Sequence, residues 1–401
     1  MDTDTEPAAG ESVTDFYDGE NLLRVVATAI MRLAQGHLHG KGSLYDAAIQ
    51  QAYDHLVLHS LRTRTKPPHS VAEMARWAAE VPLGRWPITI SSELLPPETL
   101  FVDPETRAPT QQCAEWAVSS PSAVSEVYQN AIMVGALDLA RSLEAPEIYT
   151  SFRRLLIKRP VLTAVELTRA SSEPGLDAMA HLLKRAYLRA PAAYLHDGVY
   201  LTCARCGCLL VRGASGRLLC ELDRCRRDGR PRVGRSLPAA RDGGVYQVGR
   251  PLRMFVTGPG LAETDLECRL TELGVAVEMW PGFDAYDLRV TFPSGEVWAI
   301  DVKDRANPAL LGRASRPLPA HPPYDRAFLV VPRYRFDDRE DYARVFRHHR
   351  PADLEGRLDL LTDDGLLKRA RAKTASKGRA DEVNGAGDSS PKTAAKEVDD
   401  A

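Results

Sequence analysis

The sequence lacks any run of about 18 consecutive apolar residues, the length that a membrane-spanning helix requires. Its first 21 residues are acidic and polar, with no basic segment followed by an apolar run, so we expect no secretory signal peptide. Net charge is also small, because 52 basic side chains nearly balance 54 acidic ones among 401 residues. These absences predict a cytoplasmic protein with no membrane partner, and the net charge alone gives no sign of a polyanionic partner.

Aromatic residues are few, at 7%, but hydrophobic residues make up 44% of the chain, which excludes a fibrous or wholly disordered protein. We find no internal repeat, and the length predicts two or three domains. Changes of composition divide the chain into a disordered acidic start, a mostly helical domain, a cysteine-rich insert, an α/β domain and a disordered tail. These segments cover residues 1–21, 22–198, 199–250, 251–362 and 363–401.

Residues 22–198 are expected to be mostly helical, because apolar residues recur at intervals of three and four. Thr163 followed by Glu166 forms a capping-box pattern, which predicts the start of a helix. This half of the chain contains no motif that indicates its role. The tail after Thr362 has few large apolar residues, so we expect it to be disordered.

Cysteine is scarce outside one short segment, which holds five of the seven cysteines within 23 positions: Cys203, Cys206, Cys208, Cys220 and Cys225. In a cytoplasmic chain this density predicts a metal site before disulfides, because close thiolates repel one another unless a cation compensates their charge. Cys203 with Cys206, and Cys220 with Cys225, form two pairs typical of a zinc ribbon that binds a structural Zn²⁺ through four sulfur atoms. Cys208 is either spare or takes the place of Cys206.

Residues 199–202 and 209–212 are expected to form the hairpin that holds the first pair. The two cysteines outside the cluster, Cys113 and Cys268, are expected to be buried as small apolar residues.

Positive charge is concentrated in the same segment. Between Tyr200 and Phe255 there are twelve arginines, no lysine and four acidic residues, which leaves a formal charge of +8. Guanidinium groups match phosphate oxygens, so the arginines around the second cysteine pair predict a surface that binds the nucleic-acid backbone. A solvated basic loop is the alternative. The arginines concerned are Arg224, Arg226, Arg227, Arg230, Arg232 and Arg235.

Residues 261–304 combine carboxylates and a lysine with a predicted β-hairpin. An amphipathic helix is expected from residue 261 to residue 273, followed by a strand over 275–280. Residues 286–292 and 297–302 are expected to be the two strands of the hairpin, which turns at a Pro-Ser-Gly sequence.

Asp301 and Lys303 lie at the end of the second hairpin strand, and two-residue spacing points both side chains to one face. The turn brings Asp287 roughly opposite Asp301. Carboxylate oxygens are the ligands that Mg²⁺ prefers, and such an ion polarises a phosphoryl oxygen and acidifies a bound water. The pattern therefore predicts hydrolysis of phosphodiesters, with Asp287 and Asp301 binding Mg²⁺ or Mn²⁺ and Lys303 stabilising the charge that develops.

Two choices remain open at this site. Glu263, in the preceding helix, is the candidate for a further catalytic carboxylate, but Glu267 lies one turn later. Asp284 competes in the same way with Asp287.

The order of a helical glutamate, an aspartate and Asp-x-Lys on a hairpin resembles the PD-(D/E)xK restriction-endonuclease-like superfamily. More narrowly, the segments GPGLAETDLECRL, WPGFDAYDLRV and WAIDVKD, followed by FLVVP, resemble the restriction-endonuclease-like proteins associated with prokaryotic PIWI-RE systems. The resemblance covers about residues 200–350. One departure is Tyr286, which stands where the superfamily has a proline before the first aspartate.

The resemblance implies a metal-dependent endonuclease that cuts DNA in defence against invaders, with a PIWI-like protein and a DinG-like helicase as partners. It also implies a restriction-endonuclease-like α/β core with a mixed sheet. We therefore expect an α+β multidomain protein with a mostly helical N-terminal domain, a zinc-ribbon insert and this core at the C-terminal end.

The alternative function is a non-catalytic zinc-ribbon subunit that binds nucleic acid and recruits the PIWI-like protein and the helicase. Such a subunit has no need of Asp287, Asp301 and Lys303 at one point. Asp304, which follows them, is expected to be a solvated residue at the end of the strand, and Arg335 an exposed or phosphate-contacting residue.

Overall fold

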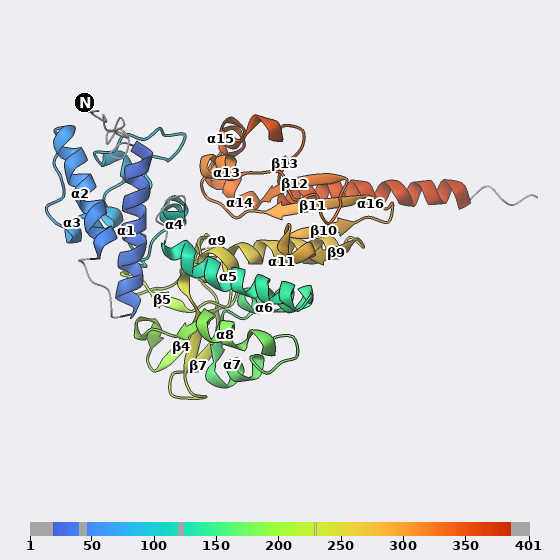
Figure 1. Ribbon diagram of the computed structural model, residues 1–401, viewed down its shortest axis with the longest axis horizontal. Helices are drawn as coiled ribbons and strands as arrows, with labels where there is room; N and C mark the ends of the chain where they lie inside the picture. Colours follow the sequence, from blue (N-terminus) through green and yellow to red (C-terminus); the bar gives the residue numbers. More distant parts are fainter. Residues whose placement is uncertain (1–18, 40–45, 119–123, 228, 230, 386–401) are drawn as a thin grey trace, which may run out of the picture.

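The computed structural model describes residues 19–39, 46–118, 124–227, 229 and 231–385. The chain is α+β, with helices dominating its first part and a mixed sheet in its last part (Figure 1). Of the N-terminal segment expected to be disordered, residues 1–18 lie outside the described residues, and a helix already begins at Gly19.

The first part is mainly helical, as expected. Thr163 caps the seventh helix with the complete capping box, because Thr163 and Glu166 each accept the other's backbone N–H. Three short strands interrupt the helices: β1 (Val161–Thr163), β2 (Tyr187–Arg189) and β3 (Leu195–His196). The helices are α1 (Gly19–His39), α2 (Ala47–Arg62), α3 (Val71–Glu80), α4 (Gln111–Val118), α5 (Val124–Ser142), α6 (Pro146–Lys158), α7 (Ala164–Ala170) and α8 (Ala180–Ala186).

The cysteine-rich segment contains short strands and one helical turn. The hairpin expected from residues 199–202 and 209–212 is wrong in its pairing, since only a single bridge joins Thr202 to Leu209. The reason is that β4 pairs with β3 and β7, whereas β5 pairs with β6. The elements are β4 (Val199–Cys203), β5 (Leu210–Arg212), β6 (Leu218–Cys220), α9 (Asp223–Arg226), β7 (Val233–Pro238) and β8 (Val245–Val248), the last pairing with β1 and β2.

The last part is built on a five-stranded mixed sheet with the order β13-β12-β11-β10-β9. Strands β9, β10 and β11 pair antiparallel, and β12 and β13 are added in parallel. The expected hairpin and mixed sheet are therefore both present. The strands are β9 (Ala276–Met279), β10 (Leu288–Thr291), β11 (Val297–Val302), β12 (Arg326–Val331) and β13 (Asp359–Thr362). The helices are α10 (Arg250–Leu252), α11 (Gly258–Thr271), α12 (Pro281–Asp284), α13 (Pro308–Ala314), α14 (Arg333–Asp338), α15 (Tyr342–His349) and α16 (Asp363–Gly385), with a π-helical turn before α11.

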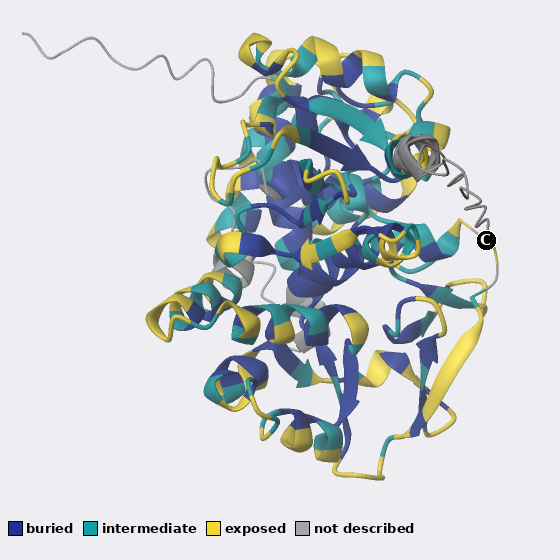
Figure 2. Ribbon diagram, turned by 90° about the vertical axis from the view of Figure 1, so that its right-hand side faces the viewer, coloured by how far each residue is buried: buried dark blue, intermediate teal, exposed yellow. Residues whose placement is uncertain are grey.

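Alternation along β12 shows how helices cover the two faces of the sheet. Phe328 and Val330 point into the core that also contains residues of α11 and α16. Leu329 and Val331 point the other way and pack with α13 and α15. The central strands β11 and β12 are accordingly mostly buried, whereas the edge strands β9 and β13 are more exposed; Figure 2 colours the chain by burial.

The expectation of a disordered tail is wrong for Asp363 to Gly385, which form α16. Leu366, Leu367 and Ala370 are buried against the sheet. Their spacing of one and four positions places the few apolar residues of this segment on one face of the helix, which its average composition concealed. Residues 386–401 lie outside the described residues.

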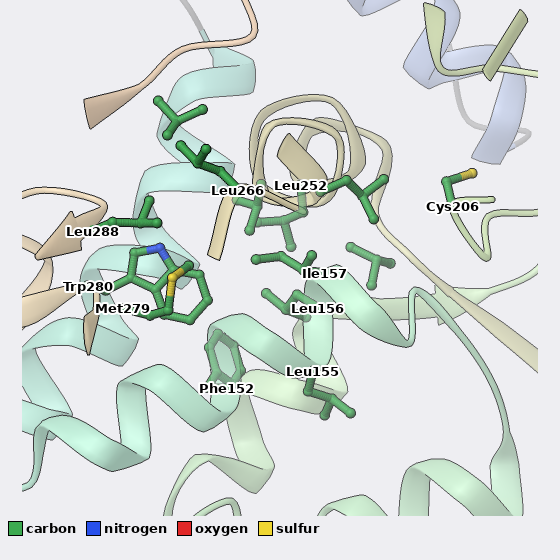
Figure 3. Close-up of a cluster of buried hydrophobic side chains, with 14 of the residues drawn as sticks. Phe152, Leu155, Leu156, Ile157, Cys206, Leu252, Leu266, Met279, Trp280 and Leu288 are labelled. Atoms are coloured by element: carbon green, nitrogen blue, oxygen red, sulfur yellow. The ribbon is translucent and has the colours of Figure 1, made fainter. Parts of the chain in front are cut away.

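One apolar core joins α6 to the cysteines and the sheet. Phe152 and Leu156 of α6 point toward Leu266 of α11 and toward Trp280, which follows β9 (Figure 3). Figure 1 shows α11 between the sheet and helices α5 and α6. The helical first part therefore reaches the sheet through α6 and α11.

The close approach of α6 and α11 depends on Gly260. A Cβ atom at this position would lie 2.3 Å from Cδ1 and 2.4 Å from Cγ1 of Ile157. Such distances are far below van der Waals contact, so only glycine fits without a shift of the buried Ile157 side chain or of the helices.

We expect Gly260→Ala to lower the free energy of unfolding by about 1–3 kcal/mol, because it overpacks this helix crossing. Gly135→Ala in α5 is the matched control. Its Cβ would meet Leu182 at an ordinary 3.5 Å, so helix propensity should leave stability unchanged or raise it by up to about 1 kcal/mol. Urea unfolding of both variants measures the difference, and equal stabilities would contradict the proposed close contact.

Candidate active site and cysteine cluster

The β10–β11 hairpin brings Asp287, Asp301 and Lys303 together. Its register pairs Leu288 with Ile300, so Asp287 and Asp301 occupy the next opposed positions. Lys303 Nζ lies 2.6 Å from Asp301 Oδ1 and 3.5 Å from Asp287 Oδ2. The convergence of these three side chains, predicted from residue spacing, is present in the structure.

Glu263 is buried on α11, and both of its carboxylate oxygens are engaged. Arg153 of α6 donates from Nη2 to both oxygens at 2.9 Å, and Trp280 Nε1 donates to Oε2 at 2.7 Å. The same Nη2 lies 3.3 Å from Asp287 Oδ1. Glu263 thus adjoins Asp287 through an arginine.

The two alternative carboxylates have other partners. Glu267 is paired with Arg154 at 2.9 Å. Asp284 accepts hydrogen bonds at 2.5 Å from Arg153 Nη1 and from the hydroxyl of Tyr149. The structure therefore places Asp287, rather than Asp284, beside Lys303, and it places Asp284 on the far side of Arg153.

The loop between β9 and β10 adopts a strained conformation. Trp280, Phe283 and Asp284 all have positive φ angles, between 50° and 65°. Non-glycine residues in this region cost about 1–3 kcal/mol each, so they persist only where other contacts hold them. Here the contacts are those that Arg153 and Tyr149 make with Asp284 and that Glu263 makes with Trp280.

Arg153 and Tyr149 are site residues that the sequence analysis missed, since it assigned nothing specific to the helical half. A signal was present. Arg153 lies four residues after Tyr149, three before Leu156 and four before Ile157, so it shares a helix face with these three buried residues. An arginine on the apolar face of a helix indicates a buried anionic partner.

Burial and neighbouring charges give the carboxylates of the site different pKa values. Burial raises the pKa of Asp301 to about 7, with Lys303 opposing the rise and Asp287 adding to it. Burial likewise raises the pKa of Glu263 to about 8, against the attraction of Arg153. For Asp287, burial acts in the same direction, but Lys303 and Arg153 together lower its pKa below the usual value. Asp287 is therefore the firmly ionised member of the set.

Lys303 keeps its charge at this site. Burial alone would lower the pKa of the ammonium group, but Asp287 and Asp301 raise it above its ordinary value. The arrangement thus presents two carboxylates suited to a hard divalent cation beside a permanently charged ammonium group.

Four of the five clustered cysteines could hold a metal ion. Cys203, Cys206, Cys220 and Cys225 are buried, and their sulfur atoms all lie within 4.8 Å of one another. Sulfurs around a tetrahedral zinc are separated by roughly 3.8 Å, given Zn–S distances of about 2.3 Å. Cys208 is not in this group, so the geometry favours Cys206 over Cys208 as the fourth sulfur.

The two isolated cysteines differ. Cys113 is buried, as expected. Cys268 is exposed, which corrects the expectation, because it lies on the outer side of α11, where its thiol faces Glu272.

The clustered arginines are mostly engaged with carboxylates of other segments. Arg224 pairs with Asp265, Arg226 with Asp103 and Asp223, Arg227 with Asp338, and Arg235 with Glu166. Arg232 is exposed, and Arg230 lies outside the described residues. These ion pairs bind the cysteine-rich segment to its neighbours and neutralise much of its charge, while phosphate binding stays a prediction.

Asp304 and Arg335 are buried, which corrects the expectation of a solvated residue and an exposed basic rim. Asp304 accepts hydrogen bonds from Arg335 Nε at 2.7 Å and from the Tyr334 hydroxyl at 2.5 Å. Arg335 Nη1 also lies 3.5 Å from Asp223, in the helical turn that carries Cys225. The parallel pairing of β12 with β11 explains this, since α14 then begins beside the residue that follows Lys303.

A second group with metal-binding side chains lies at the surface. His348 Nδ1 is 3.0 Å from Glu93, and His349 Nε2 is 3.7 Å from the same carboxylate. His348 is 65% exposed, and Arg344 also pairs with Glu93.

Comparison with known families defines the class of the C-terminal part. Residues 260–378 match the family model described as "REase associating with pPIWI_RE", so this part is similar to restriction-endonuclease-like proteins of such systems. Residues 22–163 match a second model, described as "pPIWI_RE three-gene island domain Y". The two matches confirm the resemblance to restriction-endonuclease-like proteins of pPIWI-RE systems. No curated protein and no solved structure matches the chain.

The matched ranges divide the site between them. Glu263, Asp287, Asp301 and Lys303 lie in the first range, whereas Arg153 lies in the second.

Within the part of the chain that the structure describes, no helix is long and apolar enough to cross a membrane.

Arg335→Ala should lower the free energy of unfolding by about 3–5 kcal/mol, because it leaves the Asp304 carboxylate buried without its cation. Arg333→Ala is the control two positions away. Its side chain is 61% exposed and paired with Asp337, so its loss should change stability by less than about 0.5 kcal/mol. Chemical denaturation of both variants checks this, and a small effect at Arg335 would show that the buried network is not stabilising.

Proposed function

We propose that the protein is a metal-dependent endonuclease that hydrolyses phosphodiester bonds of DNA as part of a pPIWI-RE defence system. The observation that supports this most is the convergence of Asp287 and Asp301 on Lys303 at the end of the hairpin. A nucleic-acid-binding subunit without activity has no use for that convergence. The restriction-endonuclease-like match to the same segment agrees with the proposal.

Asp287 and Asp301 would hold Mg²⁺ or Mn²⁺, and this donor set of carboxylate oxygens fits such an ion. The bound ion would supply Lewis-acid polarisation of the phosphate and a more acidic water. Lys303 would then orient the attacking water and stabilise the charge that develops on the phosphate. Asp287 accepts a hydrogen bond from the Val302 N–H at 2.7 Å, which fixes the orientation of its carboxylate.

A cleft with arginines in its lining supports nucleic acid as the substrate. It runs between the second cysteine pair and α11 and is lined by Arg205, Arg224 and Arg227. A neighbouring cleft is lined by Arg224, Arg269 and Val302 among other residues. The description of the matched families supports a PIWI-like protein as a partner, and we propose the DinG-like helicase as a second one.

Cleavage should require Asp301 and Lys303. We expect Asp301→Asn and Lys303→Met each to reduce Mg²⁺- or Mn²⁺-dependent cutting by at least about 100-fold, because one removes a metal ligand and the other the cation beside the reacting phosphate. The assay uses supercoiled plasmid and labelled single strands. Glu267→Gln, on the same helix as Glu263 but paired with Arg154, should cut at the wild-type rate.

DNA binding without cleavage, even after addition of the PIWI-like protein and the helicase, would favour the non-catalytic subunit. Undiminished cutting by Asp301→Asn would place the reaction elsewhere in the chain.

We also propose that the four clustered cysteines hold a structural Zn²⁺. Their buried sulfur atoms lie close together, and a bound cation would offset the repulsion between their thiolates. The arginine pairs around them then connect this centre to the rest of the molecule.

Cys206→Ser should lose the zinc, whereas Cys208→Ser should keep it, because only Cys206 belongs to the cluster. Elemental analysis should find almost no zinc in Cys206→Ser and close to one zinc per chain in Cys208→Ser. Loss of the ion should lower the Tm by roughly 5 °C or more, since binding of a structural metal is coupled to folding. Zinc retained in Cys206→Ser and lost in Cys208→Ser would reverse the assignment.

A further inference from the structure

We infer that Arg153 takes the position of a second divalent cation, so that the proposed nuclease site binds a single metal ion. This inference rests on the proposed function, because it concerns the metal stoichiometry of the same site. It assigns a positioning role to a residue of α6, outside the segment that resembles the endonucleases.

The first argument is that Arg153 already contacts both oxygens of Glu263 and lies between Glu263 and Asp287. Oε1 accepts from Arg153, and Oε2 accepts from Arg153 and from Trp280. Among the described residues, the groups whose three or more ligand atoms lie within 4.8 Å do not include Glu263 with Asp287 and Asp301. Glu263 therefore acts through Arg153 as a positioning residue and is not placed as a ligand of the same ion.

The second argument is charge. Glu263, Asp284, Asp287 and Asp301 carry a formal charge of −4 when ionised, and Arg153 with Lys303 reduces it to −2. One divalent ion neutralises that remainder. A second ion would leave a mostly buried site with an unbalanced charge of +2, which is strongly unfavourable. Without Arg153 the remainder would be −3, so one divalent ion would leave a net charge of −1, which attracts a further cation.

The third argument is that Arg153 cannot easily leave. Its side chain is only 12% exposed, and its guanidinium lies 4.7 Å from the centre of the Trp280 ring. It contacts three carboxylates from three segments at once, namely α11, α12 and the start of the hairpin, and its charge is permanent. A fixed cation of this kind bridges Asp287 to Glu263, where a second metal would otherwise sit.

The test counts bound Mn²⁺ by electron paramagnetic resonance in Arg153→Gln and in the otherwise wild-type chain. Every protein also carries Glu93→Gln, which disables the surface group with His348 and His349. We expect one ion per chain with Arg153 present and two with Arg153→Gln. Two ions with Arg153 present, or one ion in both proteins, would overturn the inference.

Arg154→Gln is the matched control. Arg154 is the next residue of α6 and lies 5.5 Å from the same Trp280 ring, but it pairs with Glu267, so the count should stay at one. If Arg153→Gln does not fold, Asp301→Asn decides. A single-ion site should then bind no Mn²⁺, whereas an ion retained between Glu263 and Asp287 would overturn the inference.

Cleavage measured on the same samples separates this inference from the proposed function. A protein that binds one ion and cuts nothing would support the single-ion site and contradict the nuclease. A protein that cuts DNA and binds two ions with Arg153 present would support the nuclease and contradict the single-ion site.

Discussion

The contact of one guanidinium with three carboxylates is the interaction on which the candidate site depends. Arg153 joins α6 to α11 through Glu263, to the strained loop through Asp284, and to the hairpin through Asp287. Each of these carboxylates would be costly to bury alone. The arginine thus makes possible a site whose parts come from distant stretches of sequence.

Other features of the fold serve the same arrangement. The absence of a side chain at Gly260 lets α11 lie close enough to α6 for this contact. On the other side of the hairpin, Arg335 connects Asp304 to Asp223 and hence to the second cysteine pair. The residues around Lys303 are therefore held from two directions, by α6 and by the cysteine-rich segment.

The sequence predicted those parts of the site that depend on residues close together in the chain. The hairpin that opposes Asp287 and Asp301 follows from strand spacing and one turn, and the sulfur cluster follows from two cysteine pairs. Arg153 could not be assigned in this way, because its partners lie more than 100 residues away. The burial of Asp304 likewise depends on tertiary packing, which composition and periodicity do not encode, whereas the helix that carries Leu366 was concealed only by the average composition of its segment.

The continuous core has a consequence for any attempt to study the endonuclease-like segment by itself. A fragment beginning at residue 260 would expose the faces of α11 and Trp280 that Phe152 and Leu156 cover. It would also leave Glu263 without the guanidinium that pairs with it. The packing of this segment thus depends on α6, and a fragment meant to preserve the site would have to include α6 together with α11.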